Sequence, residues 1–356
     1  MAIRTARKGR GAATNEVGRF ERFERHAIDD GWGSIDEELP RLVTEVLPDK
    51  SRTAITYNNS PDIPFDRSIN AFRGCEHGCV YCYARPTHAY LGLSPGQDFE
   101  SKLFAKFDAA RLLKKELGKK SYECRAIAFG TNTDPYQPIE QKLEITRQIL
   151  EVLDAHNHPV TIVTKSSRIT RDLDILSRMA ERNLVFAALS VTTLDRDLAR
   201  TMEPRAATPG RRLEALAELA AAGIPTGVMV APMIPALNDS ELEAILAKAA
   251  EAGAKSAGYV FLRLPMEIKE LFEEWLDTHV PDRKNHVLAL LRQARGGDLY
   301  RSGFGERMRG TGPFADLLER RFQLACRRLG LSNARISLDT SSFVPPAKDE
   351  RQLSLL

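Results

Sequence analysis

The sequence predicts an α/β protein whose core is a partial, open-sided (β/α)6 barrel of the TIM type. Six short apolar segments are typical of parallel strands buried on both faces, because they lack the alternation of a half-exposed strand. Helical patterns lie between these segments, which indicates parallel strands joined by right-handed crossovers. Periodicity does not decide whether the sheet closes, and six units fit an open-sided barrel. The chain has 356 residues, enough to bury one large domain of this kind with appendages.

The predicted elements follow one another in a regular order along the chain. The expected strands are residues 68–73, 126–130, 160–164, 185–191, 226–231 and 258–264. The expected helices include residues 145–155, 171–180, 211–222 and 240–251. Gly223 and Pro225 follow the third of these helices, as expected at a helix C-terminus.

Composition shifts suggest additional segments on both sides of the barrel. The first ten residues contain four basic side chains and little apolar patterning, which predicts a partly flexible extension. A proline-containing, charged stretch near the end reads as a tether. We therefore expect an extension at 1–60, the barrel at 61–265, a helical C-terminal lobe at 266–335 and a tail at 336–356.

The bulk properties predict a soluble cytoplasmic protein without a membrane partner. Hydrophobic residues make up 43% of the chain and charged residues 28%, and the net charge is only +3. No apolar run approaches the roughly 20 residues that a membrane helix needs, and the N-terminus lacks the apolar stretch of a secretory signal. Three of the five cysteines lie in one short loop, which favours metal binding over a disulfide framework.

That loop has the spacing CxxxCxxC and directly follows the first expected strand. Cys75, Cys79 and Cys82 would bind zinc or an iron-sulfur cluster as thiolates, and three ligands leave one position of a four-position site open. Gly74 and Gly78 let the backbone bend round a bulky inorganic centre. Zinc completed by a nearby histidine, His77 or His88, is the alternative.

Polar side chains also follow the next three expected strands. They occupy residues 130–136, 164–166 and 190–193 and include hydroxyls, a carboxylate and an amine. The carboxyl ends of parallel strands meet at one rim of the sheet, so these groups should lie beside the cysteine loop. A purely structural sheet does not require this arrangement, and we infer a functional site at the rim.

The motifs resemble those of the radical S-adenosylmethionine (SAM) enzymes, and within them the spore photoproduct lyase branch of DNA-repair enzymes. The chain is also similar to an uncharacterised bacterial subfamily that shares the segment at 74–96. The resemblance rests on CxxxCxxC with YCY at 81–83, TxTD at 131–134, VTK at 163–165, LSV at 189–191, MEP at 202–204 and VAP at 230–232.

The resemblance implies two cofactors and a reaction. Cys75, Cys79 and Cys82 would ligate three irons of a 4Fe-4S cluster, and the fourth iron would bind the amino and carboxylate groups of SAM. Reductive cleavage of SAM would give a 5′-deoxyadenosyl radical that abstracts hydrogen from a substrate. A reductase such as flavodoxin or ferredoxin would supply the electron.

The resemblance also assigns roles to individual residues, each with a structural alternative. Tyr83 would be catalytic or would only pack, and Tyr81 would lie near the adenine. Thr133 and Asp134 would lie near the methionine end of SAM, although Asp134 also suits an Asx turn before Pro135. The remaining SAM contacts would be Lys165, alternatively a surface lysine, and Ser190, alternatively a core hydroxyl.

One position departs from the lyase pattern. Where the lyase has a cysteine that returns a hydrogen atom to the product, this chain has Thr131. An alcohol O–H bond is much stronger than a thiol S–H bond, so threonine cannot replace that donor. The sequence therefore predicts a substrate other than the spore lesion, or another route for returning the hydrogen.

Two further features point to DNA as a partner. Residues 291–330 contain nine arginines and four acidic residues, which suits phosphate binding or, alternatively, a solvated face with internal ion pairs. Residues 352–356, QLSLL, resemble the pentapeptide that docks bacterial repair proteins on the DNA polymerase sliding clamp. A tail that folds back on the core is the alternative.

The sequence leaves two other functions open. The same enzyme class would also act on RNA, protein or a small metabolite. A zinc-stabilised adaptor that docks on the clamp without catalysis would share the cysteine loop and the tail, but it would contain no iron or labile sulfide.

Overall fold

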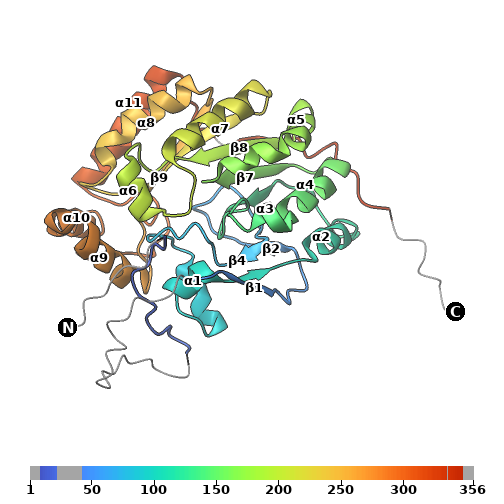
Figure 1. Cartoon of the computed structure of the whole chain (residues 1–356). Coiled ribbons are helices and arrows are strands. Elements are labelled where there is room, and N and C mark those ends of the chain that lie inside the picture. The colour runs from blue at the N-terminus through green and yellow to red at the C-terminus, as the bar shows by residue number, and fades with distance from the viewer. Residues whose placement is uncertain (1–8, 22–41, 335, 348–356) are drawn as a thin grey trace.

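The computed structural model describes residues 9–21, 42–334 and 336–347. An open sheet of seven strands lies at its centre, with helices packed around it (Figure 1). The strand order is β10-β9-β8-β7-β6-β3-β2, in which the first six are parallel and β2 pairs antiparallel with β3. β10 and β2 are the two edge strands and do not pair with each other, so the prediction of an α/β fold with a partial barrel is confirmed. The strands are β2 (Ile55–Tyr57), β3 (Arg67–Ile69), β6 (Ile127–Phe129), β7 (Val160–Thr164), β8 (Val185–Ser190), β9 (Thr226–Met233) and β10 (Ser256–Phe261).

Helices cover the outer face of this sheet, each after the strand that precedes it (Figure 1). Most of these helices bury an apolar side, and the sheet and these helices share one hydrophobic core. The covering helices are α2 (Ala109–Leu117), α3 (Glu140–Leu143), α4 (Ile145–Ala155), α5 (Leu173–Glu181), α6 (Arg196–Met202), α7 (Pro209–Ala221) and α8 (Leu242–Glu251). α4 has the predicted bounds, whereas the predicted 171–180 helix begins as a 3-10 turn, η2 (Ser167–Asp172), and the 240–251 helix begins as η3 (Asp239–Glu241).

The predicted strand at 68–73 is wrong in one respect, because it is two strands in two sheets. β3 ends at Ile69, and β4 (Phe72–Arg73) pairs with β5 (Lys102–Ala105), which pairs in turn with β1 (Glu45–Pro48). The break falls at Asn70, whose side-chain oxygen accepts hydrogen bonds from the Thr131 hydroxyl and two backbone N–H groups after β6. The cysteine loop therefore starts from the small sheet β1-β5-β4.

The C-terminal part of the chain begins with α9 (Ile268–His279), α10 (Pro281–Gln293) and α11 (Pro313–Leu329), the last of which packs against α8. Between α10 and α11, the chain contacts both sides of the open sheet. The Phe261 N–H at the end of β10 donates to Met308 O, and Arg307 pairs with Asp62 between β2 and β3. This segment therefore bridges the open side of the barrel.

Residues 336–347 run along the opposite end of the sheet from the cysteine loop. Asp339 N donates to Asn183 O and Val344 N donates to His156 O, and these acceptors lie just before β8 and β7. The described tail thus crosses the amino ends of the strands. Among the described helices, none has the length and apolar character required to cross a bilayer.

Candidate active site

The cysteine loop leaves β4 and turns through two glycines in the left-handed region. Gly74 has φ 78° and Gly78 has φ 67°. A Cβ at Gly74 would lie 2.8 Å from both Phe99 O and a Leu103 methyl group, so glycine is required there for space as well as for conformation. Cys75 and Cys79 are buried and Cys82 is half-buried, and all three are free thiols.

The histidines considered as zinc ligands have other surroundings. His77 Nδ1 lies 3.4 Å from the Asp134 carboxylate, and His88 Nε2 lies 2.9 Å from Lys102 O. Over the ranges that the structure describes, no three His, Cys, Asp or Glu side chains form a group fit to hold a metal ion. Burial raises the pKa of the Cys79 thiol to about 12, and an electropositive centre would reverse that effect. As their side chains stand, the three cysteines do not converge on a single ion; by number and donor type they suit a multinuclear iron-sulfur cluster with one free corner.

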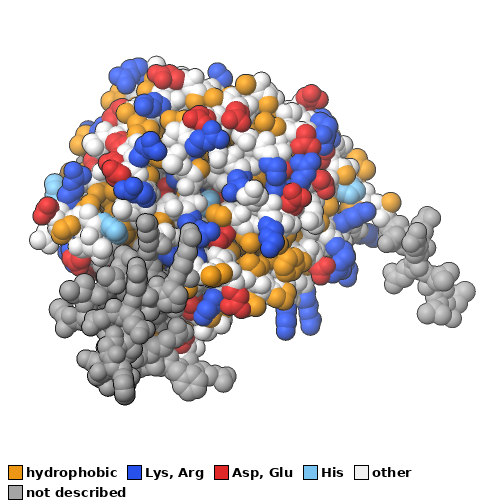
Figure 2. Space-filling view, viewed as in Figure 1, with side chains coloured by type: hydrophobic (Ala, Val, Ile, Leu, Met, Phe, Trp, Pro, Cys, Tyr) orange, Lys and Arg blue, Asp and Glu red, His pale blue; other side chains and the backbone are white. Residues whose placement is uncertain are grey.

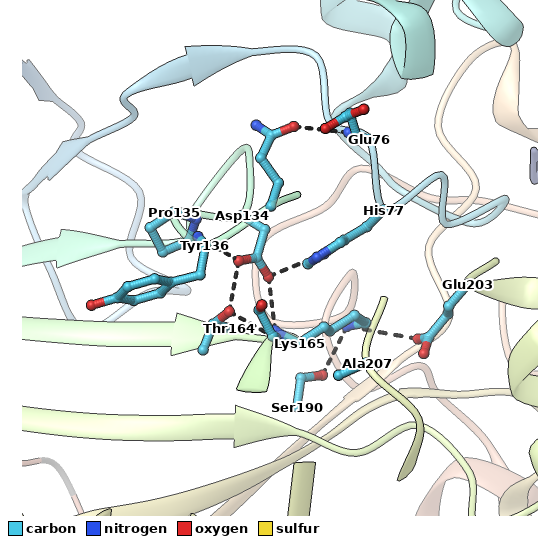
Figure 3. Close-up of polar contacts among 12 residues, drawn as sticks. Glu76, His77, Asp134, Pro135, Tyr136, Thr164, Lys165, Ser190, Glu203 and Ala207 are labelled. Atoms are coloured by element: carbon cyan, nitrogen blue, oxygen red, sulfur yellow. Dashed lines mark hydrogen bonds and ion pairs between the residues drawn. The ribbon is translucent and has the colours of Figure 1, made fainter. Parts of the chain in front are cut away.

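Asp134 links the cysteine loop to the end of β7 (Figure 3). Its carboxylate accepts hydrogen bonds from the Thr164 hydroxyl at 2.6 Å, Lys165 N at 2.8 Å and Tyr136 N at 2.9 Å, in addition to the contact with His77. Burial by itself would raise the pKa of Asp134, but His77 and these donors outweigh burial and lower the pKa to about 2. The Tyr136 contact is the Asx turn that the sequence offered as the structural alternative. The other contacts connect Asp134 to the cysteine loop and to the end of β7.

The Lys165 ammonium group lies inside the rim at the centre of the site. It donates to the Ser190 hydroxyl at 2.8 Å and lies 3.9 Å from the Glu203 carboxylate (Figure 3). It is also 5.8 Å from the ring centroid of Tyr81, close enough for a cation-π contact. Its side chain is 16% exposed, so the alternative of a free surface lysine does not describe it.

Glu203 is the buried acceptor of this network, and residue-by-residue reasoning missed it. Its carboxylate pairs with Arg212 and accepts hydrogen bonds from the Tyr81 hydroxyl and, at 2.6 Å, from the Thr192 hydroxyl. Burial would raise the pKa of Glu203, but the charges of Arg212 and Lys165 lower it to about 2. The signal in the sequence was the MEP motif, which contains Glu203 without indicating its partners.

The cations of this network face carboxylates. Lys165 and Arg212 lie beside the carboxylate of Glu203, and the Asp134 carboxylate accepts the backbone N–H of Lys165, so two cations are matched by two carboxylates. Arg212 is fully buried, whereas the Lys165 side chain is partly exposed and lies 3.9 Å from Glu203. The Lys165 ammonium group is therefore the cation that could also contact the carboxylate of a bound ligand.

Tyr83 lies on the solvent side of the loop. It is 42% exposed, its hydroxyl donates to Thr131 O, and the Arg263 guanidinium stacks over its ring at 4.7 Å. Thr133 is buried and its hydroxyl donates to Phe72 O at 3.0 Å. The structure thus brings Tyr81, Asp134, Lys165 and Ser190 into one network, places Tyr83 at the exposed side, and turns the Thr133 hydroxyl toward the backbone.

Comparison with known proteins gives a family match and a match of fold. The model of the Radical SAM superfamily matches residues 69–249. An uncharacterised protein of Mycobacterium tuberculosis is 36% identical over 237 residues, 66% of this chain and 70% of that protein. An uncharacterised protein of Methanocaldococcus jannaschii is 26% identical over 239 residues, 67% of this chain and 85% of that one.

Among solved structures, spore photoproduct lyase has a similar fold. The lyase complexed with dinucleoside spore photoproduct matches with a TM-score of 0.59 and 18% identity, covering 80% of both chains. A lyase double mutant with bound AdoMet and the same dinucleoside matches with a TM-score of 0.58 and 17% identity over 80% of both chains.

Proposed function

The chain belongs to the radical SAM superfamily, whose members use a 4Fe-4S cluster and SAM, and we propose that its rim is the site of SAM cleavage. In this proposal Cys75, Cys79 and Cys82 hold the cluster, which supplies the electron that cleaves SAM and so generates a radical able to abstract hydrogen. The contacts from His77 through Asp134 to Lys165 carry the proposal, because they join the cysteine loop to the cluster of charged side chains at the strand ends.

We assign SAM contacts to the side chains of this side-chain cluster. The Lys165 ammonium group suits the SAM carboxylate, and the Ser190 hydroxyl bonded to Lys165 would bind the ribose or the same carboxylate. The Tyr81 ring would pack near the adenine. Asp134 already accepts several protein donors, so it would act by orienting Lys165 and the loop near the methionine end, where Thr133 also lies.

Tyr83 is the candidate for hydrogen transfer to or from the substrate. It is exposed, follows the last cysteine of the loop and contacts the backbone of Thr131, the residue that replaces the cysteine donor of the lyase. A phenol gives up a hydrogen atom far more easily than the alcohol of Thr131. We therefore propose that Tyr83 takes part in returning hydrogen and that Thr131 does not.

The proposed substrate is a nucleic-acid component, acted on in DNA repair. The shared fold of spore photoproduct lyase supports this proposal, as does the exposed ring of Tyr83 beside the half-buried Arg263, since aromatic and guanidinium groups suit an unstacked base. A base inside a duplex must first be exposed, which costs a few kcal/mol and favours damaged sites.

The arginine-rich lobe gives weaker support. Arg307 and Arg321 are ion-paired with acidic residues, Arg301 and Arg309 lie 3.6 Å from carboxylates, and Arg295 is buried against backbone carbonyls. On the face drawn in Figure 2, basic and acidic side chains are interspersed over the helices. These contacts favour the alternative of an ion-paired face for that part of the lobe.

The clamp-binding peptide at 352–356 lies outside the described residues and stays a proposal. Residues 336–347 lead to it along the amino ends of the strands, so docking there would leave the rim free. Deleting residues 352–356 should abolish co-purification with the clamp. Unchanged binding by the deletion variant, or no binding by the intact chain, would refute it.

The central test is anaerobic reconstitution with iron and sulfide, followed by dithionite and SAM. We expect brown protein with about four irons per chain and formation of 5′-deoxyadenosine. Zinc in colourless protein would support the adaptor instead. Incubation with dinucleotide spore photoproduct should give little thymine product because Thr131 replaces the cysteine, and efficient repair would contradict that expectation.

A further inference from the structure

The chain's N-terminal segment packs directly on the cysteine loop. At Gly11, a Cβ would lie 1.7 Å from Gly78 O, so the two backbones touch with no space between them. The N–H groups of Gly11 and Ala12 both donate to the Glu100 carboxylate, at 3.0 and 2.9 Å. Arg10 adds a hydrogen bond to the backbone oxygen of Glu100 at 2.6 Å. Residues 10–12 are therefore fixed on α1 (Gln97–Ser101) and against the loop.

The same carboxylate neutralises a fully buried arginine. Glu100 and Arg85 are both 0% exposed and pair at 2.5 Å. The Arg85 guanidinium donates to Cys79 O at 2.8 Å and to Gly78 O at 3.1 Å, which are backbone groups of the cysteine loop. Its remaining donors bind the carbonyl oxygens of Pro95 and Gly96. All the N–H directions of the guanidinium fork are thus used.

This arrangement fixes the cysteine loop by its carbonyl groups. A planar guanidinium held by a buried carboxylate cannot turn, so the peptide groups of Gly78 and Cys79 are held in one orientation. The cysteine side chains extend from that backbone. The hydrogen bonds of Arg85 to the loop end on backbone carbonyl oxygens, so they position the thiols through the backbone.

We propose that Arg85, Glu100 and residues 10–12 position the cysteine loop for its cluster and slow loss of the cluster. We call these residues the clamp, which is unrelated to the DNA polymerase sliding clamp. The inference rests on the proposed cluster site. Arg85, Glu100 and residues 10–12 are positioning residues, because they would act on the cluster through the loop. Partners that orient metal ligands typically change metal affinity about 10- to 100-fold when altered. Without the clamp, the loop would sample conformations in which the thiols are misplaced.

The sharpest variant is Gly11→Ala, which removes no hydrogen-bonding group but forces the segment off Gly78. The matched control is Gly210→Ala in α7, where a Cβ meets nothing within 4 Å. After reconstitution of the full chain, iron release to a chelator should be about tenfold faster for Gly11→Ala. The control should release iron at the wild-type rate. Iron release is measured at a temperature at which the cluster-free form of both variants is fully folded, so a lower unfolding temperature of Gly11→Ala does not account for faster release.

A second pair separates positioning from general stability. Arg85→Lys keeps the charge but loses the fork, and Arg295→Lys does the same to a buried arginine whose hydrogen bonds go to carbonyl oxygens outside the cysteine loop, including Leu262 O at 2.9 Å. Both variants should unfold at lower temperature. Only Arg85→Lys should release iron faster and show a broadened electron paramagnetic resonance signal in the reduced cluster.

Wild-type iron release by Gly11→Ala would overturn the clamp, and so would equal acceleration in Arg85→Lys and Arg295→Lys. In either case a wild-type chain with a full cluster leaves the proposed function standing. A reconstituted wild-type chain without iron and sulfide would instead overturn the proposed function, and the clamp with it.

Discussion

The rim of the barrel and the arginine-rich lobe both contain arginine–glutamate ion pairs, but the pairs differ in burial. At the rim, the side chains of Arg212 and Glu203 are 1% and 0% exposed, and they share their surroundings with Lys165 and Tyr81. In the lobe, Arg309 and Glu319 are 67% and 24% exposed at a separation of 3.6 Å. Burial makes the first pair part of a site. Solvent screens the second pair, so its contribution to the free energy of unfolding is only about 0–1 kcal/mol. A count of charges would have ranked the lobe first.

The largest difference between the two regions should appear on removing a thiol. Cys79→Ala should bind less than a full cluster and form no measurable 5′-deoxyadenosine, because the cluster loses one of three ligands. Cys326→Ala, in buried α11 of the lobe, should keep its iron and lose only about 1 kcal/mol of packing. Full iron content in Cys79→Ala with SAM cleavage intact would contradict the assignment of the site.

Removing the buried carboxylate should give the next largest effect. Glu203→Gln leaves Arg212 without its counterion and should lower the free energy of unfolding by about 3–5 kcal/mol. Glu319→Gln in the lobe should change it by less than about 1 kcal/mol. Urea denaturation at neutral pH measures both, and equal losses would mean that burial does not distinguish the two pairs.

The pH dependence of stability tests the same carboxylate. The pKa of Glu203 is lowered in the folded chain from 4.5 to about 2, so the folded state resists protonation. Its stabilisation is complete above about pH 4.5 and is lost as the pH falls toward 2, by up to about 3 kcal/mol. The wild-type unfolding free energy should fall over this interval, and the slope should be smaller in Glu203→Gln. An identical slope in both proteins would remove Glu203 from the acid response.

Lys165→Met should weaken SAM binding more than it lowers the free energy of unfolding. Loss of one charge-assisted contact should weaken SAM binding about tenfold or more, with unchanged iron content. Lys284→Met is the control, since Lys284 forms a surface ion pair with Asp277 in the helices after the barrel. Equilibrium dialysis of reconstituted protein with SAM measures both, and equal affinity for Lys165→Met and wild type would exclude Lys165 as a SAM contact.

The smallest expected effect is at an exposed arginine of the lobe. Arg309→Gln should change the free energy of unfolding by less than about 0.5 kcal/mol and leave 5′-deoxyadenosine formation unchanged. Single-stranded DNA should bind the variant as it binds wild type, because Arg309 already faces Glu319. A clear loss of DNA affinity would move the proposed nucleic-acid surface from the rim to the lobe.

The sequence by itself determined the α/β class, the cysteine loop and the polar strand ends, because each depends on local periodicity or on residues close in the chain. Residues 160–164 are a strand and 145–155 a helix within the bounds that the pattern indicates. Proximity in sequence also placed Asp134 and Lys165 at neighbouring strand ends. Their mutual contact then needs only the parallel order of the sheet.

Tertiary structure decided the partners that lie far apart in the chain. Asn70 interrupts the first expected strand by accepting hydrogen bonds from the loop after β6, and no pattern within 68–73 indicates this. Likewise Tyr81 meets Glu203, and Gly11 meets Gly78, only when the sheet and the N-terminal segment pack. Periodicity reports whether a side chain is buried, whereas packing selects which distant group satisfies its hydrogen bonds and charge.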